Sequence, residues 1–185
     1  MTPRTKFLLL LGFFAAPMFA AWIAYFGWHP DKHKNYGSLL KVTPLTQTAG
    51  TLADGKPLSL DTMKGKWLLM YVGSAACNTL CQQQLYYMRQ SRLVLGKDQD
   101  RVARVWVLTD QGQPEAALLQ AHAGLLVWRP ANASFITQFP AARPGASHLY
   151  LVDPLGNLMM RFPENVEPKK LIKDLKLLLK ASQIG

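Results

Sequence analysis

Two cysteines are the residues of this chain whose type and spacing could do chemistry. Cys77 and Cys81 are its only cysteines, and they lie four positions apart in the segment YVGSAACNTLCQQQL. A thiolate is both a nucleophile and a ligand for soft metal ions, so such a pair can form a disulfide or hold a metal. We therefore expect the chemistry of the chain to reside in this pair.

The Cys-x3-Cys spacing is compatible with both kinds of chemistry. In a regular helix the Cβ atoms of residues i and i+4 lie about 5–6 Å apart, whereas a disulfide places them about 3.8 Å apart. A disulfide therefore requires the chain at Cys77 to bend toward Cys81. A metal ion with bonds to sulfur of about 2.3 Å bridges the wider gap, and two thiolates with few further ligands suit Cu(I). The third interpretation is a pair of inert, buried cysteines.

The segments around the cysteines predict a strand followed by a helix. Residues 67–72 (WLLMYV) are continuously apolar but too few for a helix, which indicates a buried strand. From residue 78 to about residue 95 apolar side chains recur at helical spacing. The cysteines then lie in the loop after the strand and in the first helical turn, where the helix dipole favours a thiolate. Ligands in open α/β sheets bind at this end of the strands.

The remaining apolar runs and turn signals complete the predicted fold. They indicate a hairpin at 51–60, a strand at 102–108, a helix at 114–122, a short apolar run at 125–128, a short helix at 132–139, a hairpin at 148–162 and an amphipathic helix at 167–181. Strands that alternate with helices predict a mixed sheet with helices on both faces. We expect an α/β fold, a thioredoxin-like sandwich.

One histidine is a candidate third metal ligand. His148 opens the first strand of the last predicted hairpin. In a thioredoxin-like sheet this strand lies beside residues 67–72, so His148 can face the cysteine loop. A lone histidine is more often structural than a ligand, so the residue types alone do not assign this role.

The chain begins with a long apolar segment. Residues 7–28 contain no charged residue, and roughly 20 apolar residues suffice to cross a bilayer as a helix. Trp22, Tyr25 and Trp28 gather at one end, as is typical of a membrane interface. Bulky residues disrupt the small-x-small pattern of a cleavage site, so we expect an anchor rather than a signal peptide. A slight excess of positive charge before the segment predicts a cytoplasmic N-terminus and a domain outside the cytoplasm.

Length and charge restrict the domain organisation and the partners. The 185 residues suit one domain with a short extra segment. We expect a tail and anchor at 1–28, a connector at 29–44 and the domain at 45–185. The chain carries a formal charge of +10 but no phosphate-binding glycine loop and no interleaved aromatic–basic pattern, so nucleic acid is not an expected partner. The charge points instead to a membrane or an acidic protein.

Three features together resemble the Sco/SenC family of copper-binding, membrane-anchored, thioredoxin-like proteins. They are the single N-terminal span, the segment ADGKPLSLDTMKGKWLLMYVG before the cysteines, and HLYLVDPLGNLMMRF with its histidine. The resemblance implies that Cys77, Cys81 and His148 bind copper, as Cu(I) or as Cu(II). It also implies a metallochaperone, rather than an enzyme, that helps to build the copper centre of a cytochrome c oxidase subunit. The location implied is a bacterial inner membrane, with the C-terminal domain in the periplasm.

The chain departs from this family in three places, one of which is the loop at 121–135, and this keeps two alternatives open. Asn78 stands where members usually have proline, and an Asp-rich stretch is reduced to residues 109–115. One alternative is a membrane-anchored thiol–disulfide oxidoreductase, in which Cys77 attacks and Cys81 resolves. The other is a scaffold that has lost metal binding, since a fold can outlive its original site.

Overall fold

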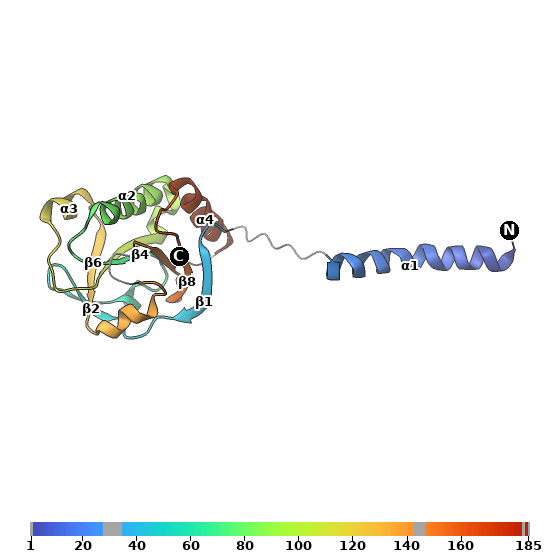
Figure 1. The fold of residues 1–185 in the computed structure, drawn as a ribbon, viewed down its shortest axis with the longest axis horizontal. Coiled ribbons are helices and arrows are strands. Elements are labelled where there is room, and N and C mark those ends of the chain that lie inside the picture. Colours follow the sequence, from blue (N-terminus) through green and yellow to red (C-terminus); the bar gives the residue numbers. More distant parts are fainter. Residues whose placement is uncertain (1, 28–34, 143–146, 183, 185) are drawn as a thin grey trace. The chain divides into compact units, whose positions relative to one another are not determined.

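The computed structural model describes residues 2–27, 35–142, 147–182 and 184 (Figure 1). The chain divides into two compact units, residues 1–34 and 35–185, which we consider separately. Trp28 of the predicted interfacial group and the first part of the expected connector lie outside the described residues.

The first unit contains one long helix, α1 (Pro3–Gly27), with Pro17 inside it. Its most apolar stretch of 18 residues has a mean hydropathy of 2.2, and none of that stretch is buried. Twenty-five residues at about 1.5 Å each exceed the thickness of a hydrocarbon core of about 30 Å. By length and composition α1 is therefore a candidate single-pass anchor.

The second unit is built on a mixed sheet of eight strands in the order β1-β8-β7-β4-β5-β6-β2-β3. The strands are β1 (Ser38–Pro44), β2 (Ala49–Leu52), β3 (Pro57–Ser59), β4 (Trp67–Gly73), β5 (Val102–Leu108), β6 (Leu125–Pro130), β7 (Leu149–Val152) and β8 (Asn157–Arg161). The central pairs β4–β5 and β5–β6 are parallel, and the other pairs are antiparallel. This arrangement confirms the predicted thioredoxin-like α/β fold.

Helices and short turns complete the two layers around the sheet. The helices are α2 (Thr79–Val94), α3 (Ala116–Ala121) and α4 (Pro168–Ala181), with short 3-10 helices at Leu60–Met63, Gly96–Arg101 and Ala133–Gln138. Side chains of α2 and α4 share one apolar cluster with Trp106 of β5. A second cluster unites strand residues such as Val107 with Phe135 of the last 3-10 helix. Alternate side chains of the central strands thus enter two cores, which explains why β4 has no charged or polar side chain on either face.

The first strand differs from the expected organisation. Residues 38–44, which the sequence predicts to be part of a connector, form β1 and pair with β8 at one edge of the sheet. Six of the seven side chains of β1 are exposed, and only Leu40 is partly buried. Because backbone hydrogen bonds rather than apolar burial hold an edge strand in place, the sequence of β1 lacks the periodicity that reveals other strands.

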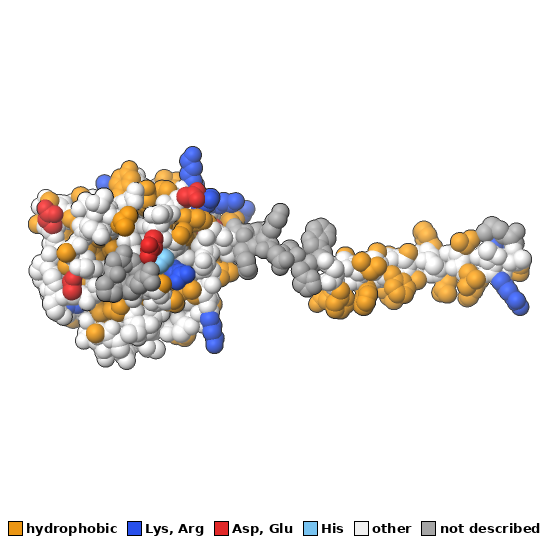
Figure 2. All heavy atoms as spheres, viewed as in Figure 1, with side chains coloured by type: hydrophobic (Ala, Val, Ile, Leu, Met, Phe, Trp, Pro, Cys, Tyr) orange, Lys and Arg blue, Asp and Glu red, His pale blue; other side chains and the backbone are white. Residues whose placement is uncertain are grey.

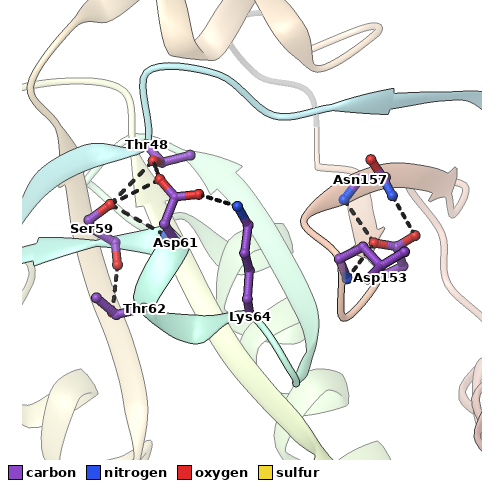
Figure 3. A network of polar contacts seen from close by, with 8 residues as sticks. Thr48, Ser59, Asp61, Thr62, Lys64, Asp153 and Asn157 are labelled. Atoms are coloured by element: carbon purple, nitrogen blue, oxygen red, sulfur yellow. Dashed lines mark hydrogen bonds and ion pairs between the residues drawn. The ribbon is translucent and has the colours of Figure 1, made fainter. Parts of the chain in front are cut away.

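Polar networks fix the turns around the sheet (Figure 3). The Asp61 carboxylate accepts a hydrogen bond from the Thr48 hydroxyl and forms an ion pair of 2.8 Å with Lys64. In the turn between β7 and β8, the Asp153 carboxylate accepts hydrogen bonds from the backbone N–H and the side-chain amide of Asn157. The predicted hairpin turn is thereby closed by its own aspartate, as is typical of such turns.

Candidate functional site

The two cysteines lie together, and they are joined in a disulfide. Cys77 is in the loop after β4 and Cys81 is in the first turn of α2, with their Cα atoms 5.2 Å apart. The strand–loop–helix placement predicted from the sequence is confirmed, and the loop bends toward the helix as a disulfide requires. Cys81 is only 2% exposed, whereas Cys77 is partly exposed. The pair therefore has one accessible sulfur and one buried sulfur.

Asn78 determines how the helix begins between the two cysteines. Its side-chain oxygen accepts a hydrogen bond of 3.0 Å from the backbone N–H of Cys81. Asparagine is among the best residues at this capping position, because its side chain satisfies a free N–H of the first turn. The residue that departs from the family pattern thus has a local structural role. It also places Cys81 within the first turn, where the helix dipole favours an anionic sulfur.

Asp110 holds the other side of the cysteine loop in place. This residue follows β5, and its carboxylate accepts hydrogen bonds from the Ser74 hydroxyl, from the Ala75 N–H at 3.2 Å and from the Gly112 N–H at 3.1 Å. The hydrogen bond from Ser74 is the main cause that lowers the pKa of Asp110. The ionised carboxylate therefore ties the loop after β4 to the loop after β5.

Arg129 supports this connection from the neighbouring strand. From β6 its Nε donates to the Asp110 backbone oxygen at 3.0 Å, and a terminal guanidinium nitrogen donates to the Gly112 oxygen at 2.6 Å. We assigned no role to Asp110 or Arg129 from the sequence. The available signal was an aspartate directly after a buried strand that runs parallel to the strand before the cysteines.

A pocket of about 400 Å³ lies beside the partly exposed Cys77. It is lined by Ala75, Ala76, Cys77, Asn78, Gln113, Glu115 and Leu118. Glu115 is the one charged residue in this lining, so the pocket has a negative charge close to the disulfide. Because Cys77 lines this pocket, a thiol from solvent can approach Cys77 through it.

The structure does not bring His148 to the cysteines. His148 lines a different pocket, of about 500 Å³, together with Arg161 and Glu164. No residue is common to the two pockets. Within the described parts of the chain, no group of three or more His, Cys, Asp and Glu side chains could hold a metal ion.

The register of the sheet explains the position of His148. Tyr71 of β4 lies opposite Leu149 of β7, and both belong to the apolar cluster that includes Cys81. His148 directly precedes this strand, and its ring lies 6.2 Å from that of Tyr150, whose side chain belongs to the second cluster on the opposite face. Residues 143–146, which precede this strand, lie outside the described residues.

The hydrogen bonds of His148 determine which ring nitrogen is available. Its Nδ1 lies 2.8 Å from the Phe162 backbone oxygen, which can only accept, so Nδ1 carries the proton. Its Nε2 lies 3.5 Å from a Glu164 carboxylate oxygen. Nε2 is therefore the nitrogen that can bind a metal.

Comparisons with known proteins agree with this fold. Among solved structures, apo Sco1 from Thermus thermophilus shares 20% identity over 80% of this chain and 99% of its own, with a TM-score of 0.62. Copper-bound yeast Sco1 shares 14% identity over 80% of this chain and 94% of its own, also with a TM-score of 0.62. BsSco, described as a member of the Sco family of cytochrome c oxidase assembly proteins with a disulfide switch, shares 18% identity over 80% and 96%, with a TM-score of 0.54.

These similarities confirm the Sco-like fold that the sequence resemblance implied. No curated protein sequence matches the chain. A family model described as a transmembrane-like, thioredoxin-like, C-terminal domain matches residues 67–182, which is more than half of the chain. The chain therefore belongs to the family of transmembrane-like, thioredoxin-like C-terminal domains.

Proposed function

We propose that the chain is a membrane-anchored assembly factor that works by thiol–disulfide chemistry at Cys77 and Cys81. The observation that carries this proposal is the disulfide at the start of α2, in which Cys77 is partly exposed and Cys81 is buried. Cys77 lines the pocket beside the loop and Cys81 does not, so a partner thiol or disulfide that enters this pocket reaches Cys77 first. The disulfide switch described for BsSco, which has the same fold, supports this proposal.

The exchange between the cysteine pair and a partner disulfide takes place in two steps. In the reduced pair, the Cys77 thiolate attacks a disulfide of the partner; a Cys77–partner bond forms and one partner sulfur leaves as a thiolate. The Cys81 thiolate then attacks the Cys77 sulfur, releases the second partner thiolate and closes the disulfide. Two electrons pass to the partner, whose two thiolates take up protons. The reverse sequence, with a dithiol protein as reductant, restores the reduced pair.

Copper transfer is the second candidate function, with Cu(I) as cargo. Copper-bound yeast Sco1 shares the fold, and two thiolates of the reduced pair are soft ligands that suit Cu(I). His148 remains the proposed third ligand, because its Nδ1 proton is held by Phe162 and leaves Nε2 for the metal. A site with all three ligands requires His148 to leave Glu164 and approach the cysteines. The proposed recipient is a cytochrome c oxidase subunit.

The proposed location follows from the anchor and from the disulfide. We propose that α1 crosses a bacterial inner membrane once, with the domain in the periplasm. Disulfides persist in oxidising compartments such as the periplasm and are rare in the cytosol, which supports this orientation.

Trapping the mixed disulfide tests the proposal. The full chain is prepared with Cys81→Ser or, as the matched control, with Cys77→Ser, and each is exposed to a disulfide-bonded peptide. We expect Cys81→Ser to accumulate a covalent adduct through Cys77, seen by mass spectrometry. The Cys77 sulfur attacks the peptide disulfide, and the resulting mixed disulfide has no second thiol to resolve it. Equal or faster adduct formation by Cys77→Ser would overturn the assignment of Cys77 as the attacking residue.

A copper titration separates the second candidate from the first. One Cu(I) bound per reduced chain, lost in Cys77→Ala/Cys81→Ala, supports the copper function, and a smaller loss of affinity in His148→Ala supports the third ligand. If copper binding is the same in the double variant, the cysteines do not carry the metal.

A further inference from the structure

A row of lysines faces solvent on the last helix, α4. Four exposed lysines make up this α4 lysine row: Lys169, Lys173, Lys176 and Lys180. Their spacings of four, three and four residues place them on one side of the helix. None of the four has a carboxylate partner among the residues that the structure describes, whereas Lys170 is paired with Glu167 at 2.8 Å. The row therefore presents uncompensated positive charge.

The α4 lysine row also includes apolar surface. Together with Ile172 and Leu177 it lines a groove of about 390 Å³, and Leu177 is 44% exposed. Figure 2 shows basic side chains at the edge of the domain where Figure 1 places α4. Lysines flanking exposed leucine and isoleucine are typical of helices that lie at a membrane surface, where the aliphatic stems contact lipid and the ammonium groups reach the headgroups.

The chain enters the domain at the buried side of the same helix. Asp174 is 1% exposed, and one of its oxygens accepts hydrogen bonds from the backbone N–H groups of Tyr36 and Gly37, both at 2.8 Å. The Tyr36 hydroxyl in turn accepts a hydrogen bond of 2.9 Å from the Glu167 N–H. Residues 36 and 37, at the start of the domain, are thus hydrogen-bonded to α4.

The length of the covalent chain limits how far this helix can lie from a bilayer that holds α1. Only residues 28–34 separate the end of α1 from Asn35, and a connection of this length spans at most about 28 Å when fully extended. Because the entry point is bonded to α4, the α4 lysine row stays within a few nanometres of any membrane that holds α1. A weak attraction suffices at such a high local concentration.

We propose that the α4 lysine row binds anionic lipid headgroups of the membrane in which the chain's own anchor lies. This inference rests on the proposed anchoring by α1. Each lysine near an anionic surface contributes roughly a fivefold increase in binding. No residue of α4 lines the pocket of Cys77, so the membrane-bound domain leaves its disulfide accessible to a partner.

Lysine acetylation of the full chain in lipid nanodiscs tests the inference. Discs of phosphatidylcholine alone are compared with discs that also contain phosphatidylglycerol, and the acetylation rate of each lysine is read by mass spectrometry. In the phosphatidylglycerol discs we expect severalfold slower acetylation of the α4 lysine row, with no change at Lys56 in the β2–β3 turn. Added salt should remove the difference, because it screens charges at the surface.

A matched pair of variants assigns the effect to α4. Lys173→Gln/Lys176→Gln should weaken the protection of Lys169 and Lys180, whereas Lys41→Gln/Lys56→Gln, which removes the same charge elsewhere, should leave it unchanged. Equal acetylation in both kinds of disc would overturn the inference and favour an acidic protein as the occupant of the row. Recovery of the chain with the discs reports anchoring separately. A chain that does not partition into either disc would refute the anchor itself.

Discussion

Replacing Asp110 should loosen the cysteine loop and make its disulfide easier to reduce. The Asp110 carboxylate accepts hydrogen bonds from Ser74, Ala75 and Gly112. Bonds to a charged acceptor contribute about 1.5–3 kcal/mol each when buried, but two of these three lie at the surface, where water can replace them. We therefore expect Asp110→Ala to lower the free energy of unfolding by about 2 kcal/mol, or Tm by about 4–8 °C.

The same change should alter the chemistry of the pair. If all of the lost energy appears as local opening of the loop, reduction accelerates by at most about thirtyfold. Because Cys77 is already partly exposed in the folded chain, we expect about a threefold to tenfold increase. The assay follows reduction of the full chain by dithiothreitol, with thiol alkylation and mass spectrometry at successive times.

Asp61→Ala is the matched control for this experiment. Asp61 also accepts hydroxyl hydrogen bonds and also has a lowered pKa, mainly because of Lys64, but it belongs to the network in Figure 3 and not to the cysteine loop. It should lower Tm without accelerating reduction. If the two variants are reduced at the same rate, Asp110 does not position the disulfide and the reasoning fails.

Three further predictions concern single side chains near the site or in the core. Asn78→Ala removes the cap of α2 and should lower Tm by about 2–4 °C in a thermal melt; an unchanged Tm would show that the cap is not needed. Glu115→Gln removes the charge from the pocket of Cys77 and should speed reduction by glutathione about twofold at low salt, and reduction by dithiothreitol less, because the dithiothreitol thiolate carries one negative charge fewer; an equal gain with both reagents would contradict this. Burial is the main cause that lowers the pKa of His122, so the unfolded chain binds a proton that the folded chain does not. Stability should therefore fall from about pH 7 to pH 5 in the wild type and fall less in His122→Gln, as measured by urea unfolding; parallel pH profiles would refute this.

The central strands and the cysteine site could be predicted because local patterns specify them. Strand β4 is apolar on both faces, and α2 shows helical periodicity and begins at a capping asparagine. The strand β1 could not be predicted, because an exposed edge strand depends on backbone pairing with β8, which is more than a hundred residues away in sequence. The same holds for the support of the cysteine loop by Asp110, whose hydrogen-bond partners lie 35 and 36 residues earlier.

The orientation of His148 shows the limit of predictions from neighbouring strands. The sequence correctly predicts that β7 lies beside β4. It does not specify the register, and a shift of one residue moves a side chain to the other face of a sheet. In the observed register, His148 contacts Phe162 and Glu164 rather than the cysteines. Its role as a copper ligand therefore stays a prediction.

A redox titration of the full chain tests the central claim most directly. The chain is equilibrated in glutathione buffers of increasing potential, and the two thiols are quantified by alkylation and mass spectrometry. We predict a reversible two-electron transition between the Cys77–Cys81 disulfide and the dithiol, reached from either direction. A chain that stays entirely oxidised or entirely reduced across the accessible range would contradict the proposal that this pair exchanges electrons with partners.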